Sequence, residues 1–170
     1  MTHVAATFDF TAGLRAPDAP RTHRVSVRGL VTDRAGLVLF VETGDGHLML
    51  PGGGVEDGES EVDCLHREVA EETGVVLDTV GEVLGTCTEL NPDRDGASTW
   101  ALECRYLAAT TAGATIPTAL SGYEVDLGLR PRWLRPAEGL TALVAQLGTP
   151  GRPGCWALRD LPIVAAWHGR

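Results

Sequence analysis

One short segment carries most of the charge of this 170-residue chain. Residues 53–75 contain one arginine and eight acidic residues, so they hold seven of the nine net negative charges. The acids are Glu56, Asp57, Glu59, Glu61, Asp63, Glu68, Glu71 and Glu72. Carboxylates at this density repel one another, so any fold that gathers them needs a cation or a partner that offsets their charge.

The same segment is typical of a glycine loop followed by a helix. The Pro-Gly-Gly-Gly run at 51–54 interrupts regular structure. Ser60 is a good N-cap with Asp63 three residues on, and Gly74 suits the left-handed residue that ends many helices. The spacing therefore predicts a helix over residues 61–73.

Helical spacing places the acids beside the apolar face of this helix. At about 100° per residue, the arc expected to pack on a sheet consists of Val62, Leu65, His66 and Val69. Glu68 precedes Glu71 and Glu72 by three and four residues, so three carboxylates project from one patch beside that arc. A solvated acidic face would instead lie opposite the apolar arc. Hard cations such as Mg²⁺ take carboxylate and phosphate oxygens, so the pattern favours metal-assisted phosphate chemistry.

Strand and helix patterns alternate in the rest of the chain. We expect strands at residues 24–32, 37–43, 47–50, 75–90, 98–109 and 130–134. Further helices are expected at 136–147 and 162–168, with loops at 112–122 and 148–154. The mixed order implies an α/β fold with a layered sheet. Residues 1–23 are interpreted as an N-terminal arm or a poorly fixed strand.

Composition excludes several classes of protein. The chain has no long uncharged apolar run and no basic start followed by an apolar block, so we expect no membrane span, no secretory signal and a cytoplasmic location. The net charge is −9 and no basic run occurs, which argues against nucleic-acid binding. The four cysteines form no CxxC pair, so we expect reduced thiols. Abundant Ala, Gly and Arg without Lys are typical of a GC-rich bacterial genome.

The acidic segment resembles the Nudix box, G-x5-E-x7-R-E-U-x-E-E-x-G-U, in which U is aliphatic. Gly53, Glu59 and the run from Arg67 to Val75 fill every fixed position, and Leu50-Pro51-Gly52 forms the usual lead-in. The box covers 23 residues on the predicted loop and helix. The chain is therefore identified as a member of the Nudix hydrolase family.

The flanking segments extend this resemblance over roughly residues 24–147, including Arg132-Trp133-Leu134 before a helix. The resemblance implies an α/β/α sandwich with a mixed sheet that carries the box as a loop–helix–loop. We expect residues 24–147 to form the Nudix domain and residues 148–170 to form a C-terminal extension packed on it. Homodimers are common among relatives, so a homodimer is an open alternative.

The resemblance also implies Mg²⁺- or Mn²⁺-dependent hydrolysis of the diphosphate linkage in a nucleoside diphosphate derivative. The metal ligands would be the Gly53 carbonyl, Glu68, Glu71 and Glu72. Glu59 would support a metal directly or through water, and Arg67 would orient the glutamates by ion pairing. The general base stays open between Glu68 and Glu124, which follows the 112–122 loop and is otherwise an ordinary surface acid.

Three residues outside the box are candidates for substrate binding. His47 and Met49 alternate on the strand that enters the box, so one face of that strand would line a pocket. Trp100 would stack on a nucleobase. Core packing is the alternative role for each of the three.

Two other functions compete with hydrolysis. A nucleotide-sensing or binding module would keep the fold without turnover, but such proteins usually lose box glutamates, and this chain retains them. A diphosphate-retaining isomerase would need a cysteine in a recognisable context, which none of the four has. We therefore expect a diphosphohydrolase that acts on a nucleotide, a nucleotide sugar or an ADP-ribose-type molecule.

Overall fold

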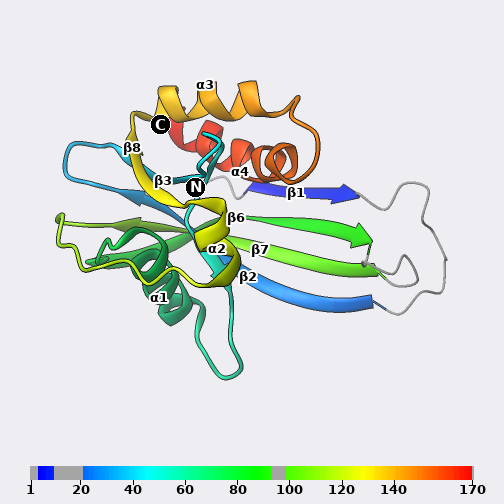
Figure 1. The fold of residues 1–170 in the computed structure, drawn as a ribbon, viewed down its shortest axis with the longest axis horizontal. Coiled ribbons are helices and arrows are strands. Elements are labelled where there is room, and N and C mark those ends of the chain that lie inside the picture. Colours follow the sequence, from blue (N-terminus) through cyan, green and yellow to red (C-terminus); the bar gives the residue numbers. More distant parts are fainter. Residues whose placement is uncertain (1–3, 10–20, 93–98, 170) are drawn as a thin grey trace.

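A computed structural model describes residues 4–9, 21–92 and 99–169. In these residues eight strands form one sheet with the order β1-β6-β7-β2-β3-β4, while β5 pairs with β2 and β8 pairs with β3 (Figure 1). The strands are β1 (Val4–Asp9), β2 (Arg21–Thr32), β3 (Val38–Glu42), β4 (Leu48–Met49), β5 (Gly52–Gly54), β6 (Thr79–Pro92), β7 (Thr99–Thr110) and β8 (Arg130–Leu134). The β1–β6 and β2–β7 pairs are parallel and the others antiparallel, so the sheet is mixed.

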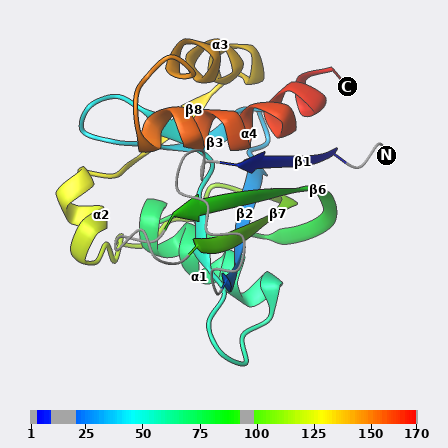
Figure 2. The same ribbon diagram turned by 90° about the vertical axis from the view of Figure 1, so that its right-hand side faces the viewer.

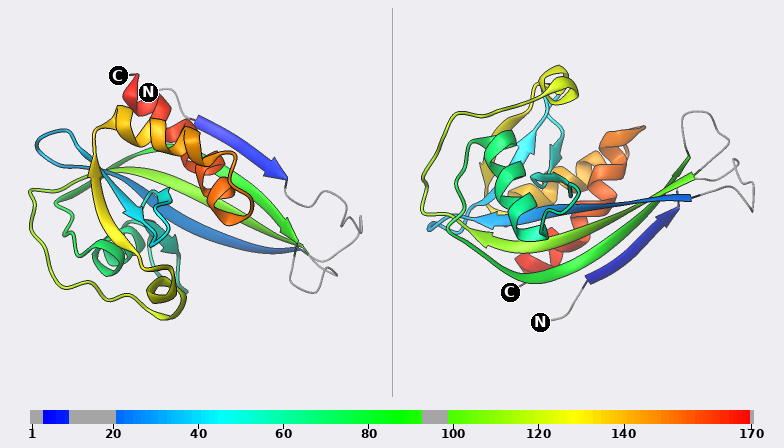
Figure 3. Two further views of the ribbon diagram at one scale, coloured as in Figure 1. Left: turned by 45° about the horizontal axis from the view of Figure 1, so that its top comes forward. Right: turned by 90° about the horizontal axis from the view of Figure 1, so that it is seen from below.

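Helices cover both faces of this sheet. α3 (Pro136–Gln146) and α4 (Arg152–His168) lie together on one face, and α1 (Glu61–Thr73) lies on the other (Figures 1 and 2). Figure 3 shows that the long strands β2, β6 and β7 run past the helices toward one end of the molecule. The expected α/β/α sandwich around a mixed sheet is therefore confirmed. Among the described residues, no helix is long and apolar enough to span a bilayer.

The core is divided by the sheet because successive strand side chains point to opposite faces. Leu30 and Phe40 join the cluster that α3 and α4 cover, together with Leu143 of α3. Val31 and Leu39, one residue away on the same strands, join the cluster that α1 covers. Burial of these apolar side chains on both faces holds the three layers together.

Helix α1 has the predicted ends but a different buried face. The Ser60 hydroxyl accepts a hydrogen bond from the Asp63 amide, and Gly74 ends the helix with a φ of 73°. Val62 and His66, expected on the packed arc, are exposed, and that part of the prediction was wrong. The residues that are buried are Cys64, Leu65, Glu68, Val69, Glu72 and Thr73. The helix is turned this way because β5, which has no side chains, leaves room for carboxylates against it.

Regular structure extends further than the sequence patterns predict. Within the expected N-terminal arm, Val4–Asp9 forms β1 and pairs with β6. α2 (Gly122–Leu127) follows directly on the 112–122 loop. The expected helix at 162–168 is the C-terminal part of α4 (Arg152–His168), which begins ten residues earlier, so the expected loop at 148–154 was wrong from residue 152 on. The helix tolerates its prolines because Pro153 lies in the first turn, where no amide is needed, and because packing on α3 outweighs the lost bond at Pro162.

Helix α3 packs closely on the sheet at Gly139. A Cβ atom at Gly139 would lie 2.4 Å from the Phe40 ring, whereas a Cβ atom at Gly148 would meet nothing within 4 Å. We expect Gly139→Ala to lower the free energy of unfolding by about 1–3 kcal/mol through overpacking. Gly148→Ala, the control, should change it by less than about 1 kcal/mol. Urea unfolding of the two variants measures the difference, and equal stabilities would contradict the close approach.

Candidate functional site

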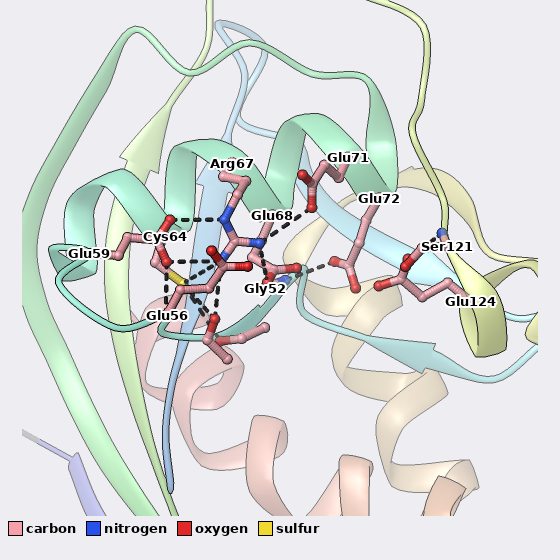
Figure 4. Close-up of polar contacts among 12 residues, drawn as sticks. Gly52, Glu56, Glu59, Cys64, Arg67, Glu68, Glu71, Glu72, Ser121 and Glu124 are labelled. Carbon is pink, nitrogen blue, oxygen red and sulfur yellow. Dashed lines mark hydrogen bonds and ion pairs between the residues drawn. The ribbon is translucent and has the colours of Figure 1, made fainter.

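Three carboxylates from two helices meet beside the glycine strand β5. Glu68 and Glu72 lie one turn apart on α1, and Glu124 lies on α2. One oxygen from each carboxylate lies within 4.8 Å of the others. Figure 4 shows Glu72 and Glu124 directed toward each other. Glu68 and Glu72 are only 8% and 6% exposed, and Glu124 is half-buried. We call these three residues the carboxylate cluster.

Backbone amides and a helix cap hold the cluster in place. The Gly52 amide donates a hydrogen bond of 2.8 Å to one Glu72 oxygen. The Ser121 amide donates one of 2.9 Å to a Glu124 oxygen, in the capping box of α2. One Glu124 oxygen therefore belongs to the cap of its own helix, and this bond fixes the Glu124 side chain beside Glu72.

The position of Glu68 explains why the loop contains glycines. A Cβ atom on Gly53 would lie 2.3 Å from the Glu68 carboxylate, so any other residue would expel it. Gly52 has a φ of 137°, and its Cβ atom would lie 2.1 Å from the Val27 carbonyl oxygen. Glycine is required at both positions because the backbone of β5 lies directly between β2 and a buried carboxylate.

Arg67 joins the loop to the helix, as the sequence predicts for an orienting residue. Its guanidinium binds both oxygens of Glu59, at 2.8 and 2.9 Å, and one oxygen of Glu68 at 2.7 Å. Hydrogen bonds from Arg67 lower the pKa of Glu59 to about 2. Glu71 is 3.3 Å from the same guanidinium, with a side chain that is 41% exposed, and lies outside the carboxylate cluster.

The cluster is short of positive charge. Burial raises the pKa of Glu72 to about 8, against the opposing effects of Arg28 and the Gly52 amide. Burial also raises the pKa of Glu68, although Arg67 opposes it. The three carboxylates of the cluster are oxygen donors, which a hard divalent cation such as Mg²⁺ or Mn²⁺ prefers. A bound cation would offset the cost of burying negative charge at this place. The residues present therefore suit the metal that the sequence resemblance implies.

Two adjoining cavities lead away from the cluster. The smaller, of about 240 Å³, is lined by the cluster, Met49 and Trp156 among others. The larger, of about 910 Å³, is lined by Trp100 and Arg24 among others. Arg28, Gly53, Gly54 and Tyr123 line both cavities.

The three sequence candidates for substrate binding are placed differently. Met49 is buried and lines the smaller cavity, and Trp100 is half-buried and lines the larger one. His47 is half-buried and lines neither of these two cavities. A substrate role stays a prediction for all three.

Arg28 is the residue of this region that the sequence patterns missed. It lies on β2, its Nη1 donates 2.7 Å to the Leu50 carbonyl, and its Nε is buried with no hydrogen-bond partner among the described residues. An arginine inside the apolar run from Val25 to Val31 was the available signal, because a charged side chain there would lie within the fold.

Cys64 lies beside the glycine strand and is a packing residue. Its side chain is fully buried against the Gly54 carbonyl, with Sγ 3.4 Å from that oxygen. Burial and the nearby Glu59 raise the pKa of the Cys64 thiol to about 12. The thiol is therefore protonated at neutral pH, which argues against a nucleophilic cysteine. All four cysteines lie within the described residues, and all are free thiols, as predicted.

The raised pKa of Glu72 predicts a stability that depends on pH. The folded, metal-free protein keeps this proton up to about pH 8, whereas the unfolded chain releases it near the ordinary glutamate pKa of 4.5. Stability should therefore fall as pH rises through this window. Glu72→Gln should make that fall smaller. Above pH 8 its free energy of unfolding should exceed that of the parent by a few kcal/mol, because each unit of pKa difference corresponds to about 1.4 kcal/mol.

Thermal unfolding between pH 4 and 9 in a chelating buffer measures this effect. Near pH 4 both proteins carry an uncharged group at position 72, so their stabilities should converge there. Parallel curves across the whole range would contradict a raised pKa at Glu72.

Comparisons with known proteins agree with the fold described above. The model of the NUDIX domain family matches residues 22–148. A NUDIX hydrolase from Nitrosomonas europaea has a TM-score of 0.61 at 20% identity, over 87% of this chain and 90% of that one. A MutT structure from work on Aliivibrio salmonicida and Vibrio cholerae has a TM-score of 0.54 at 17% identity, over 86% and 99%. The mutator MutT protein from Bacillus halodurans reaches 0.52 at 25% identity, over 70% and 72%.

No curated protein matches the chain. The family model spans well over half of the residues and includes the glycine strand and every member of the carboxylate cluster. The two solved structures at 20% and 17% identity share the fold. On the strength of the family match, this chain belongs to the NUDIX family of hydrolases.

Proposed function

We propose that this protein hydrolyses the diphosphate linkage of a nucleoside diphosphate derivative with the help of Mg²⁺ or Mn²⁺. The observation that carries this proposal is the carboxylate cluster beside β5, in which three oxygens converge within 4.8 Å. Glu68 and Glu72 would hold the cation, with the Gly53 carbonyl as a further ligand and Glu124 beside it. Bound there, a divalent cation supplies Lewis acidity and neutralises charge on phosphate and carboxylate oxygens.

Glu71 stays a predicted metal ligand, but it lies outside the carboxylate cluster. Its carboxylate faces Arg67 instead of the cluster, so it would have to leave that ion pair to reach a cation held by Glu68 and Glu72. Glu59 supports the site through Arg67, because its two oxygens hold the guanidinium that binds Glu68.

Arg28 supports a place for the diphosphate at the junction of the two cavities. Arg28 lines both cavities and carries a positive charge there, so its guanidinium is a candidate partner for a phosphate oxygen. A guanidinium there also offsets part of the repulsion between an anionic substrate and the carboxylates.

The larger cavity supports a nucleoside as the group attached to the diphosphate. Its volume of about 910 Å³ lies in the range of small-molecule sites. Trp100 offers an aromatic face for a base, and Arg24 and Ser26 offer polar groups for its edges. Met49 on the smaller cavity would contact the diphosphate end, whereas His47 has no such support.

Glu124 is the better supported of the two candidate general bases. Glu68 accepts a hydrogen bond of 2.7 Å from Arg67 and would also bind the cation, so its two oxygens are already engaged. Glu124 is held by the Ser121 cap through one oxygen and lines the smaller cavity. It would take the proton of the attacking water as the bridging P–O bond breaks.

A screen for release of the hydrolysis products, separated by ion-exchange chromatography, tests the function. The panel contains nucleoside triphosphates, ADP-ribose, nucleotide sugars and dinucleoside polyphosphates, each with and without Mg²⁺. We expect Mg²⁺-dependent release from at least one of them, and a loss of about 10³-fold or more in Glu72→Gln. Glu138→Gln on α3 is the matched control, because glutamine keeps the capping box there. Tight Mg²⁺-dependent nucleotide binding without release would instead support a binding module.

A second substitution separates the roles within the cluster. Glu124→Gln should lower kcat by about 10²–10⁴-fold, as expected for a general base, while Mn²⁺ still binds through Glu68 and Glu72. Titration of Mn²⁺ by electron paramagnetic resonance, run beside the kinetics, makes the distinction. Loss of Mn²⁺ binding in proportion to kcat would assign Glu124 as a ligand instead.

A further inference from the structure

The outer edge of β4 is closed by side chains instead of a neighbouring strand. β4 pairs with β3 through its inner edge. On the outer edge, the Leu48 amide donates 2.8 Å to Oε1 of Gln146, and Nε2 of Gln146 donates 3.0 Å to the Leu48 carbonyl. Two residues on, the Leu50 amide donates 2.8 Å to Oδ2 of Asp160. Gln146 of α3 and Asp160 of α4 therefore replace the hydrogen bonds of a missing strand.

The polar side chains of Gln146 and Asp160 are both buried, which costs free energy that an apolar residue at the same place would not cost. Gln146 is 5% exposed and Asp160 is fully buried. Burying a carboxylate costs several kcal/mol unless hydrogen bonds compensate it. Besides Leu50, the Tyr106 hydroxyl donates 2.7 Å and Arg159 Nε donates 3.0 Å to Oδ1 of Asp160. An apolar residue would fill the same space more cheaply, but it would leave the Leu50 amide without an acceptor.

The backbone held by these side chains leads directly into the carboxylate cluster. Leu50, which donates to Asp160, accepts a hydrogen bond of 2.7 Å from Arg28 through its carbonyl. Pro51 follows, with its carbonyl accepting from the Gly29 amide at 2.9 Å. The next residue, Gly52, donates its amide to Glu72. Because Pro51 has a restricted φ, a shift of Leu50 is passed on to the Gly52 amide.

We propose that Gln146 and Asp160 are positioning residues that hold β4 in register and so aim the Gly52 amide at Glu72 and the Arg28 guanidinium at the diphosphate. Asp160 lies beyond residues 22–148 that the family model matches, so this link joins the C-terminal helix to the family's site. Its effect on turnover rests on the proposed function, whereas its effect on the backbone and on metal binding does not.

Asp160→Asn tests the link most directly. The amide offers one oxygen and one NH₂ group, so it must turn a donor toward either the Leu50 amide or Arg159 Nε. Gln146→Met is a second variant, which keeps the length of the side chain but neither hydrogen bond to Leu48. Tyr106→Phe is the control, because it removes a donor to Asp160 and leaves the bond between Asp160 and Leu50 in place.

Three measurements are made on each full-length protein. Amide hydrogen exchange followed by nuclear magnetic resonance reports on Leu50 and Gly52. Mn²⁺ titration reports on the cluster, and formation of the hydrolysis products reports on turnover. In Asp160→Asn we expect about tenfold faster exchange at both amides and a 10- to 100-fold higher Kd for Mn²⁺. Gln146→Met should also speed exchange at these amides and raise the Kd for Mn²⁺. Tyr106→Phe should lose stability while its exchange at Gly52 and its Mn²⁺ Kd stay at the parent values.

The outcomes separate a positioning role from a structural one. The inference would be overturned if Asp160→Asn and Gln146→Met lower the melting temperature but keep the parent's Gly52 exchange and Mn²⁺ Kd. It would also be overturned if Tyr106→Phe shifts Gly52 exchange and the Mn²⁺ Kd as much as they do. If Asp160→Asn does not fold, Gln146→Met decides the question alone. A parent protein that binds Mn²⁺ but hydrolyses no substrate of the panel would overturn the proposed function only, since exchange and binding do not depend on turnover.

Discussion

The burial of two carboxylates against a strand without side chains is the constraint on which the rest of this structure depends. Glu68 and Glu72 are almost fully buried beside β5, and only glycine at position 53 leaves room for the Glu68 carboxylate. Burial raises the pKa of both groups, so the fold holds them at a cost in stability. Acids with strongly raised pKa values cluster at functional sites in proteins, which supports a functional role for this region.

Polar contacts from several elements offset part of the cost of burying these carboxylates. Arg67 binds Glu59 and Glu68 and joins the loop to α1, while the Gly52 amide binds Glu72. Each of these donors favours the ionised form of a buried acid, yet their sum leaves the cluster short of positive charge. A divalent cation and an anionic substrate would complete the balance, with Arg28 contributing at the junction of the two cavities.

Much of the fold could be predicted from local signals. The Ser60 cap and Gly74 give the ends of α1, and the spacing of the box residues identifies the family, because these signals depend on neighbours in the chain. The buried face of α1 could not be predicted, since it depends on β5 having no side chains to occupy the space. Arg152–His168 became one long helix because its packing outweighs an internal proline that local propensity treats as a break.

By itself, the sequence determined that one short segment would combine a glycine loop with an acidic helix, and it pointed to this segment as the candidate site. Its spacing sufficed because a helix converts fixed intervals into a common face. Only the tertiary structure decided which carboxylates meet. Glu124 reaches Glu68 and Glu72 from a helix about fifty residues away, whereas Glu71, their neighbour in sequence, turns to Arg67. The reason is that convergence depends on how α1, α2 and β5 pack, and no local pattern encodes that arrangement.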